Sequence, residues 1–73
     1  MRLFPQGTLT VTQDGADWII SGNYQGDKVE QRMALPPSPI LIMFDPNTKQ
    51  FVPIIAPDVK NDWLLVDFID YTP

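Results

Sequence analysis

The sequence predicts an all-β fold, a small single-domain antiparallel barrel or sandwich of five to six short strands. The first observation is that apolar and polar residues alternate along most of the chain, which is the pattern of half-buried strands. The second is that turn-forming residues separate these segments at intervals of about ten residues, as in small barrels and sandwiches. The third is length: 73 residues suffice for one domain. Such a domain buries about 60% of its unfolded surface, so we expect marginal stability.

The first half of the chain predicts a three-stranded antiparallel meander. Strands are expected at residues 8–12, 17–24 and 28–35, with turns at Asp14-Gly15 and at residues 25–27. β-Branched and aromatic residues recur at every second position, so one face of each strand should be buried. The residues expected to face the core are Leu9, Val11, Trp18, Ile20, Tyr24, Val29, Met33 and Leu35. Gly22, inside the second strand, indicates a bulge or a place of close packing.

The second half begins with a proline-rich segment and continues with strands. Residues 36–39 hold three prolines, which cannot enter a ladder. They favour an extended link between two strand groups over a Pro-x-x-Pro ligand. Strands are expected at residues 40–44, 49–55 and 63–71, and the first is apolar on both faces, as in a buried central strand. A type I turn is expected at residues 45–48, and residues 56–62 are the one segment suited to a short helix.

Two further features constrain these last strands and the chain ends. Pro53 lacks an amide hydrogen, so its strand should lie at a sheet edge or contain a bulge. In the final strand, strict alternation places Leu64, Val66 and Phe68 on one face. The opposite face then holds Leu65, Asp67, Ile69 and Tyr71. Residues 1–7 and 72–73 are expected to be flexible.

Two missing residue types argue for binding rather than catalysis. The chain has no His and no Cys, so it holds no imidazole base, thiolate nucleophile, disulfide or Cys- or His-ligated metal. We therefore expect a non-enzymatic protein without cofactors. The absence of disulfides favours the cytoplasm. The longest apolar run has five residues, far short of the ~20 that span a bilayer, so no membrane association is expected.

The sequence offers only weak candidates for nucleic-acid or metal sites. The five basic residues are scattered singly, whereas phosphate binding needs clusters of Lys or Arg, so direct nucleic-acid binding is not expected. Two carboxylate pairs, Asp14 with Asp17 and Asp67 with Asp70, supply too few oxygens for a hard cation. No metal site is therefore expected, and Asp14 is assigned to its turn.

The candidate site is the acidic and aromatic C-terminal strand. The chain has a net charge of −4, and residues 61–73 hold three aspartates and no basic residue. Carboxylates interleaved with aromatic rings suit a basic protein surface, because the charges steer the encounter and the rings fill pockets. The candidate partner-binding residues are Asp62, Trp63, Asp67, Asp70 and Tyr71. The alternative is a solvated last strand whose aspartates keep the domain soluble.

In length, acidity and β-rich character the chain is similar to small bacteriophage-encoded regulators of bacterial RNA polymerase. The resemblance implies a regulator or inhibitor in the host cytoplasm that binds the polymerase and blocks initiation or alters termination. We expect a monomer or a weak homo-oligomer. Two alternatives remain open. One is a structural subunit of a phage particle or larger complex, which would pair through an exposed strand edge. The other is an acidic inhibitor of a nucleic-acid-directed defence enzyme.

Overall fold

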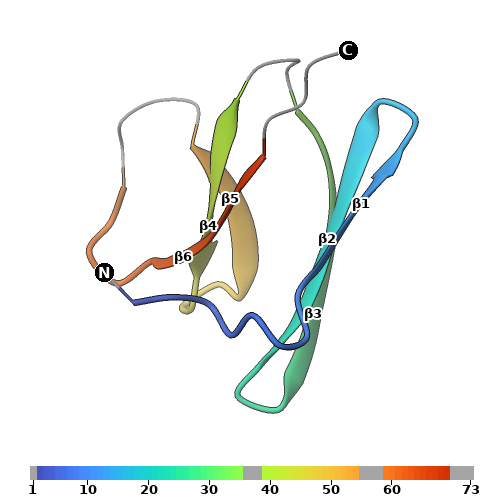
Figure 1. Ribbon diagram of the computed structural model, residues 1–73. Helices are drawn as coiled ribbons and strands as arrows, with labels where there is room; N and C mark the ends of the chain where they lie inside the picture. The colour runs from blue at the N-terminus through green and yellow to red at the C-terminus, as the bar shows by residue number, and fades with distance from the viewer. Residues whose placement is uncertain (1, 36–38, 55–58, 70–73) are drawn as a thin grey trace.

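The computed structural model describes residues 2–35, 39–54 and 59–69, which form six strands in two antiparallel sheets (Figure 1). The first sheet has the strand order β1-β2-β3, and the second has the order β5-β4-β6. The strands are β1 (Thr10–Asp14), β2 (Asp17–Tyr24), β3 (Asp27–Ala34), β4 (Ile40–Asp45), β5 (Gln50–Ile54) and β6 (Leu64–Ile69). The prediction of a small all-β fold is confirmed, and the two sheets do not close into a barrel.

Tight turns join the three strands of the first sheet. Between β1 and β2, Gly15 has a φ of 63° at the first turn position, as a type II′ turn requires. Between β2 and β3, Gln25 and Gly26 have φ values of 52° and 87°, the arrangement of a type I′ turn. The predicted meander is therefore confirmed. Its first strand begins at Thr10, two positions later than expected. At Thr8 the Asn23 N–H donates to the side-chain hydroxyl and not to the main-chain carbonyl that a strand would use.

The second sheet has β4 at its centre, as the apolar sequence of that strand predicted. β5, which contains Pro53, lies at an edge, where a missing amide hydrogen is tolerated. Asp45 organises the loop between these two strands. Its carboxylate accepts the Asn47 N–H at 2.9 Å, and its carbonyl accepts the Lys49 N–H at 2.8 Å.

A β-bulge in β6 interrupts the alternation of its side chains. Asp67 pairs with Ile42, but Leu65 pairs with the next residue of β4, Met43. Val66 is therefore an extra residue in β6, without a partner of its own. Every side chain after this point changes face relative to a strict alternation.

The bulge overturns the expectation that Phe68 lies on the same face as Leu64 and Val66. The latter two are buried at 3% and 4% exposure, but Phe68 is 59% exposed. Ile69, which was expected on the opposite face, is buried instead, at 6% exposure. The single inserted residue thus brings one aromatic ring to the surface of the molecule.

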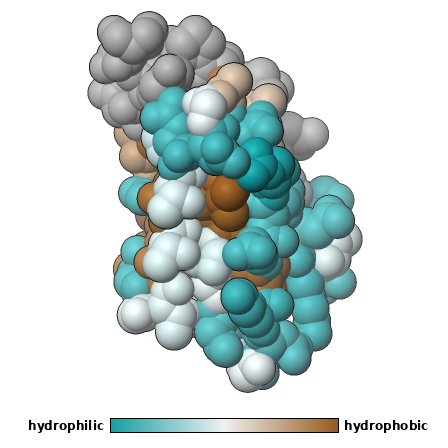
Figure 2. Space-filling model, turned by 90° about the vertical axis from the view of Figure 1, so that its right-hand side faces the viewer, coloured by the Kyte–Doolittle hydropathy of each residue, from teal (hydrophilic) through white to brown (hydrophobic). Residues whose placement is uncertain are grey.

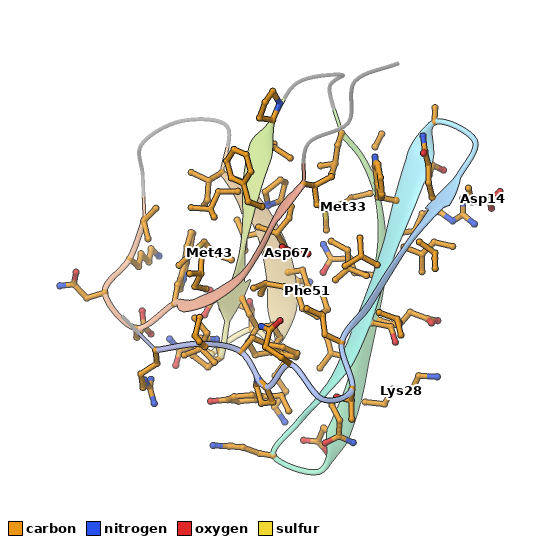
Figure 3. All side chains as sticks on the ribbon, in the orientation of Figure 1. Asp14, Lys28, Met33, Met43, Phe51 and Asp67 are labelled. Atoms are coloured by element: carbon orange, nitrogen blue, oxygen red, sulfur yellow. The ribbon has the colours of Figure 1, made fainter. Side chains whose placement is uncertain are left out.

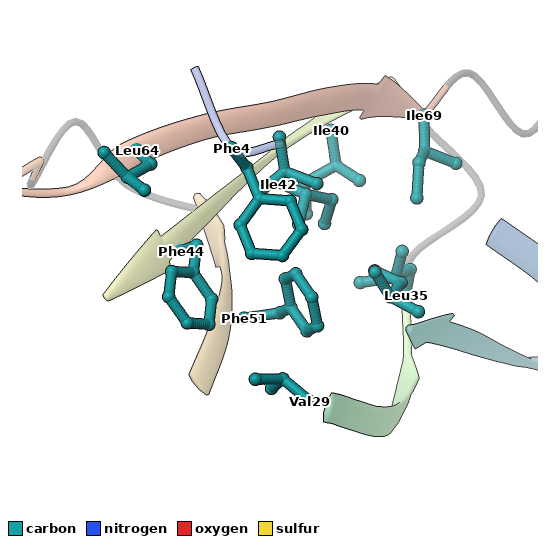
Figure 4. Close-up of a cluster of buried hydrophobic side chains, with 11 residues drawn as sticks. Phe4, Val29, Leu35, Ile40, Ile42, Phe44, Phe51, Leu64 and Ile69 are labelled. Atoms are coloured by element: carbon teal, nitrogen blue, oxygen red, sulfur yellow. The ribbon is translucent and has the colours of Figure 1, made fainter. Parts of the chain in front are cut away.

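The core lies between the two sheets and centres on aromatic rings (Figure 4). The ring centroid of Phe4 lies 4.9 Å from that of Phe44 and 5.3 Å from that of Phe51. Tyr24, from the first sheet, stacks on Phe4 with a centroid distance of 6.0 Å. Aliphatic residues from both sheets surround the rings: Ile20, Val29, Leu35, Ile40, Ile42, Leu64, Val66 and Ile69.

The N-terminal segment, which was expected to be flexible over residues 1–7, contributes Phe4 to this core. The Phe4 N–H donates to the Leu65 carbonyl at 2.8 Å, and the Leu65 N–H donates to the Arg2 carbonyl at 2.9 Å. Phe4 can enter because Gly22 has no side chain: a Cβ there would lie 2.6 Å from the ring of Phe4. The prediction of close packing at Gly22 is therefore confirmed.

Some predictions fall on residues outside the described ranges. These are the proline link at residues 36–38, the end of the fifth predicted strand at residue 55, and residues 70–73 at the chain end. Of the segment predicted to hold a short helix, residues 56–58 also lie outside. Residues 59–62 contain a turn and no helix, so the helix prediction is wrong there.

Candidate protein-binding surface

The structure separates the five candidate residues of the C-terminal strand. Asp62, Trp63 and Asp67 are within the described ranges, whereas Asp70 and Tyr71 lie outside them. Trp63 is buried, at 9% exposure, although it is not part of the core cluster between the sheets, so little of its ring is accessible to a partner. Its indole Nε1 is also buried and has no hydrogen-bond acceptor among the described residues.

The two described aspartates are exposed, and each accepts one hydrogen bond. The side-chain amide of Asn47, in the neighbouring β4–β5 loop, donates to Asp62. Asp67 accepts the N–H of its neighbour Phe68 at 2.8 Å. The Phe68 N–H points toward the edge of β6 that has no neighbouring strand. The Asp67 carboxylate accepts its hydrogen bond there in place of a strand. Of the two aspartates, only Asp67 is next to Phe68, the ring that the bulge exposes, whereas Asp62 lies at the other end of β6.

Two exposed apolar side chains near the C-terminal strand were not among the candidate residues. Phe68 is 59% exposed and Leu3 is 62% exposed. Leu3 forms a parallel bridge with Leu65, so the N-terminal segment runs beside β6 and adds to the same surface. The alternation of the sequence gave no signal for either residue, because one depends on a bulge and the other on a long-range bridge.

The outer face of the second sheet, which points away from the first sheet, is apolar. Residues that pair across neighbouring strands lie on the same face of a sheet. Leu41 of β4 pairs with Ile54 and Phe68, and Met43 pairs with Val52 and Leu65. None of the residues on this face belongs to the core between the sheets. Figure 3 shows Met43 projecting away from β2 and β3, whereas Phe51 projects toward them. We define the outer face as Leu3, Leu41, Met43, Val52, Ile54, Leu65 and Phe68.

The outer face of the first sheet is polar by contrast. Figure 2 shows this side of the molecule as mostly hydrophilic, with small apolar areas. Arg32 lies here and forms ion pairs with Asp14 at 2.7 Å and with Asp17 at 2.9 Å. Hydrogen bonds from the guanidinium to these carboxylates raise the pKa of Arg32. A sheet with one apolar and one solvated face is the usual antiparallel arrangement, and only the first sheet has it.

The edges of the second sheet are occupied. Gln31 of β3 donates from Nε2 to the Phe51 carbonyl at 2.8 Å, and its Oε1 accepts the Phe51 N–H at 2.9 Å. Pro53, two residues along β5, has no amide hydrogen to offer. At the other edge, the N-terminal segment pairs with Leu65, and Gln6 Nε2 donates to the Val66 carbonyl at 3.2 Å. What this sheet presents to a partner is therefore its face and not its edges.

The described ranges show no site of another kind. Residues 2–35, 39–54 and 59–69 contain no group of three or more side chains arranged to hold a metal ion, and no pocket. No helix in this part of the chain is long and apolar enough to cross a membrane.

No protein-family model, curated protein or solved structure matches the chain. The function is therefore inferred from the surface itself.

Proposed function

We propose that this chain is a non-enzymatic protein-binding domain that regulates or inhibits its partner by covering part of the partner's surface. The observation that carries the proposal is that the second sheet is apolar on both faces. The inner face forms the core. On the outer face Leu3 and Phe68 are exposed, whereas Met43 is fully buried and the remaining four residues are partly buried. Exposed apolar patches on small proteins mark sites of association.

The geometry also supports a chemical description of the partner. Phe68 projects from the outer face and can enter a pocket, as aromatic anchors do at the centres of interfaces. Asp67 is its chain neighbour, and Asp62 precedes the same strand. Exposed carboxylates before and within the strand that carries this ring favour a partner with basic residues near its site, because complementary charge speeds the encounter.

The specific form of the proposal is a regulator of bacterial RNA polymerase acting in the cytoplasm of a bacterial host. It is supported by the similarity in size and acidity to phage-encoded regulators and by the absence of His and Cys from the sequence. In this form the domain binds the polymerase and blocks initiation or alters termination, with no chemistry of its own.

A structural subunit of a larger assembly is the second candidate, and the free edge of β1 favours it. That strand has no second neighbour in its sheet. An acidic mimic of nucleic acid has less support, because Arg32 and Lys49 form ion pairs with three of the described acidic residues, Asp14, Asp17 and Asp27. Such pairing lowers the density of unbalanced negative charge that mimicry of a phosphate backbone needs.

The test is to measure binding to purified bacterial RNA polymerase for the wild type, Phe68→Ser and a matched control, Ile19→Ser. Ile19 is an apolar residue on the outer face of the first sheet, opposite Thr12 and Arg32. We expect Phe68→Ser to weaken binding by about tenfold or more, as for an interface anchor, and Ile19→Ser to change it little. Circular dichroism would show that both variants remain folded.

A lysate experiment separates the general proposal from its specific form. If no variant binds polymerase, the polymerase form is rejected. The same three proteins are then used as baits in a bacterial lysate. Proteins retained by the wild type and by Ile19→Ser but lost with Phe68→Ser support a partner site on the outer face. Equal retention by all three would reject that site.

A further inference from the structure

We propose that two copies of this chain associate by pairing β1 with β1, in antiparallel register about Thr12, to form a continuous six-stranded sheet. The inference does not rest on the proposed function, because it concerns the other sheet. It begins from the four edge strands, which are β1 and β3 in the first sheet and β5 and β6 in the second.

Three of the four edges are protected. At β5, Gln31 holds the main-chain groups of Phe51, and at β6 the N-terminal segment pairs with Leu65. β3 contacts β5 and is joined to it by the ion pair between Asp27 and Lys49, at 2.8 Å. β3 also carries exposed charged side chains, a common protection of edge strands: Lys28, Glu30 and Arg32.

The register shows which main-chain groups of β1 point outward. Asp14 and Asp17 close the two-residue turn as a hydrogen-bonded pair, and hydrogen-bonded and non-hydrogen-bonded pairs then alternate. The Asn23 N–H donates to Thr8 Oγ1 at 2.8 Å, which continues the same pattern beyond the end of β1. The N–H and C=O groups of Val11 and Gln13 therefore point away from β2.

These outward groups have no protection of the kinds seen at the other edges. Within the described ranges, nothing hydrogen-bonds to the main chain of Val11 or Gln13. β1 has the sequence Thr-Val-Thr-Gln-Asp, without Pro, Gly, Lys or Arg, and its pairing with β2 has no bulge. Its one charged residue, Asp14, is engaged by Arg32 at 2.7 Å. A flat edge of this kind, whose one charge is paired, is a template for another strand.

The sequence of β1 is complementary to itself in antiparallel pairing. A second copy of β1 is therefore the strand best suited to pair with this edge. A two-fold axis at Thr12 places the two Thr12 residues opposite each other and Val11 of each copy opposite Gln13 of the other. The two Val11–Gln13 pairs each exchange two main-chain hydrogen bonds, so four bonds join the copies. Thr–Thr pairs are favourable across strands, and Thr10 meets Asp14, so no like charges are opposed.

The resulting dimer leaves the outer face of the second sheet free in both copies. A partner with two equivalent sites would then be bound more tightly than by one copy. Because a five-residue edge buries little surface, we expect a concentration-dependent dimer with a dissociation constant on the order of 100 µM.

The test introduces a charged side chain at position 12, beside the proposed two-fold axis. Thr12 is exposed on the outer face of the first sheet, so Thr12→Lys and Thr12→Glu should each leave the fold intact. In the proposed register, residue 12 of one copy faces residue 12 of the other. Two copies of one variant therefore place like charges opposite each other, whereas one copy of each variant places a positive charge opposite a negative one. Sedimentation velocity and native mass spectrometry are run on the wild type, on each variant alone and on the mixture.

We expect a wild-type dimer of twice the chain's 8.3 kDa and a dissociation constant at least about tenfold higher for each variant alone. The mixture should recover a heterodimer. Gln13→Pro removes an outward donor while keeping every bond to β2, so it should also be monomeric and folded. A monomeric wild type at about 1 mM, a dimer that persists in both charge variants, or a mixture without heterodimer would overturn the proposal.

Discussion

The ring of Phe4 lies against Gly22, so close that a Cβ at position 22 would stand 2.6 Å from Phe4 Cε1. This relationship joins the N-terminal segment to the middle of β2 and fills the centre of the core, where Phe4 is fully buried. The absence of a side chain at one position is therefore the condition for the burial of a large ring at another.

The first prediction follows from this contact. Gly22→Ala should destabilise the domain by about 1–3 kcal/mol, because the added methyl group overfills the core. Phe4→Ala should cost about 3–5 kcal/mol, as for other buried Phe truncations. In the Phe4→Ala background the clash is gone, so Gly22→Ala should become neutral or slightly stabilising. Urea unfolding of the four proteins measures the coupling. Additive effects would show that the ring does not pack on Gly22.

The second prediction concerns the side-chain bridge between the sheets. Gln31→Leu should cost about 1–3 kcal/mol, because the N–H and C=O of Phe51 lose their partner in a part-buried place. Gln13→Leu is the matched control, since the side chain of Gln13 bonds the Gly15 carbonyl at an exposed turn. Its effect should stay within about 0.5 kcal/mol. Equal losses in the two variants would contradict the account of the β5 edge.

The third prediction is a pH dependence from the ion pair of Asp27 with Lys49. A hydrogen bond and charge from Lys49 lower the pKa of Asp27 below its ordinary 3.8, and Asp27 raises the pKa of Lys49 above 10.5. The contribution of Asp27 is thus present above pH 3.8 and is lost as the pH falls through its lowered pKa. The contribution of Lys49 is lost only as the pH rises through its raised pKa.

Thermal unfolding of the wild type and Asp27→Asn across acidic pH measures this effect. The variant should have the lower Tm at neutral pH, by a small margin because both groups are exposed. The difference should disappear well below pH 3.8. Glu30→Gln is the control, since no ion pair joins Glu30 to another described residue. A difference between wild type and Asp27→Asn that persists at low pH would mean that the ion pair is not its source.

The fourth prediction tests the bulge in β6. Phe68→Ser should change the free energy of unfolding by about 1 kcal/mol or less, because the ring is largely exposed. Val66→Ser, two residues earlier, should cost about 2 kcal/mol or more, because it puts a hydroxyl into the core. Losses of similar size in the two variants would support the strict alternation expected from the sequence, which places both residues on one face.

The sequence was informative where structure depends on near neighbours. β2 has the bounds that were expected, since turn-forming residues mark both of its ends. β4 was expected at the centre of a sheet because its residues are apolar on both faces, and β5 at an edge because of Pro53. In each case the chemistry of a few adjacent residues decides the result.

The features that shape the candidate surface depend on distant residues. Phe4 is buried only because Gly22 lies across the core from it, and no local pattern near residue 4 reports that. The exposure of Phe68 depends on how β6 pairs with β4. One extra residue in β6 moves every later side chain of that strand to the opposite face. Trp63 was expected at the surface on composition alone and is buried.

The measurement that tests the central claim most directly is site-specific photo-crosslinking in a bacterial lysate. A benzoylphenylalanine is placed at position 68, on the outer face of the second sheet, or at position 30, on the outer face of the first. If the outer face of the second sheet is the partner site, position 68 will give a crosslinked product with another protein and position 30 will give little. Crosslinking from position 30 without crosslinking from position 68 would contradict the claim.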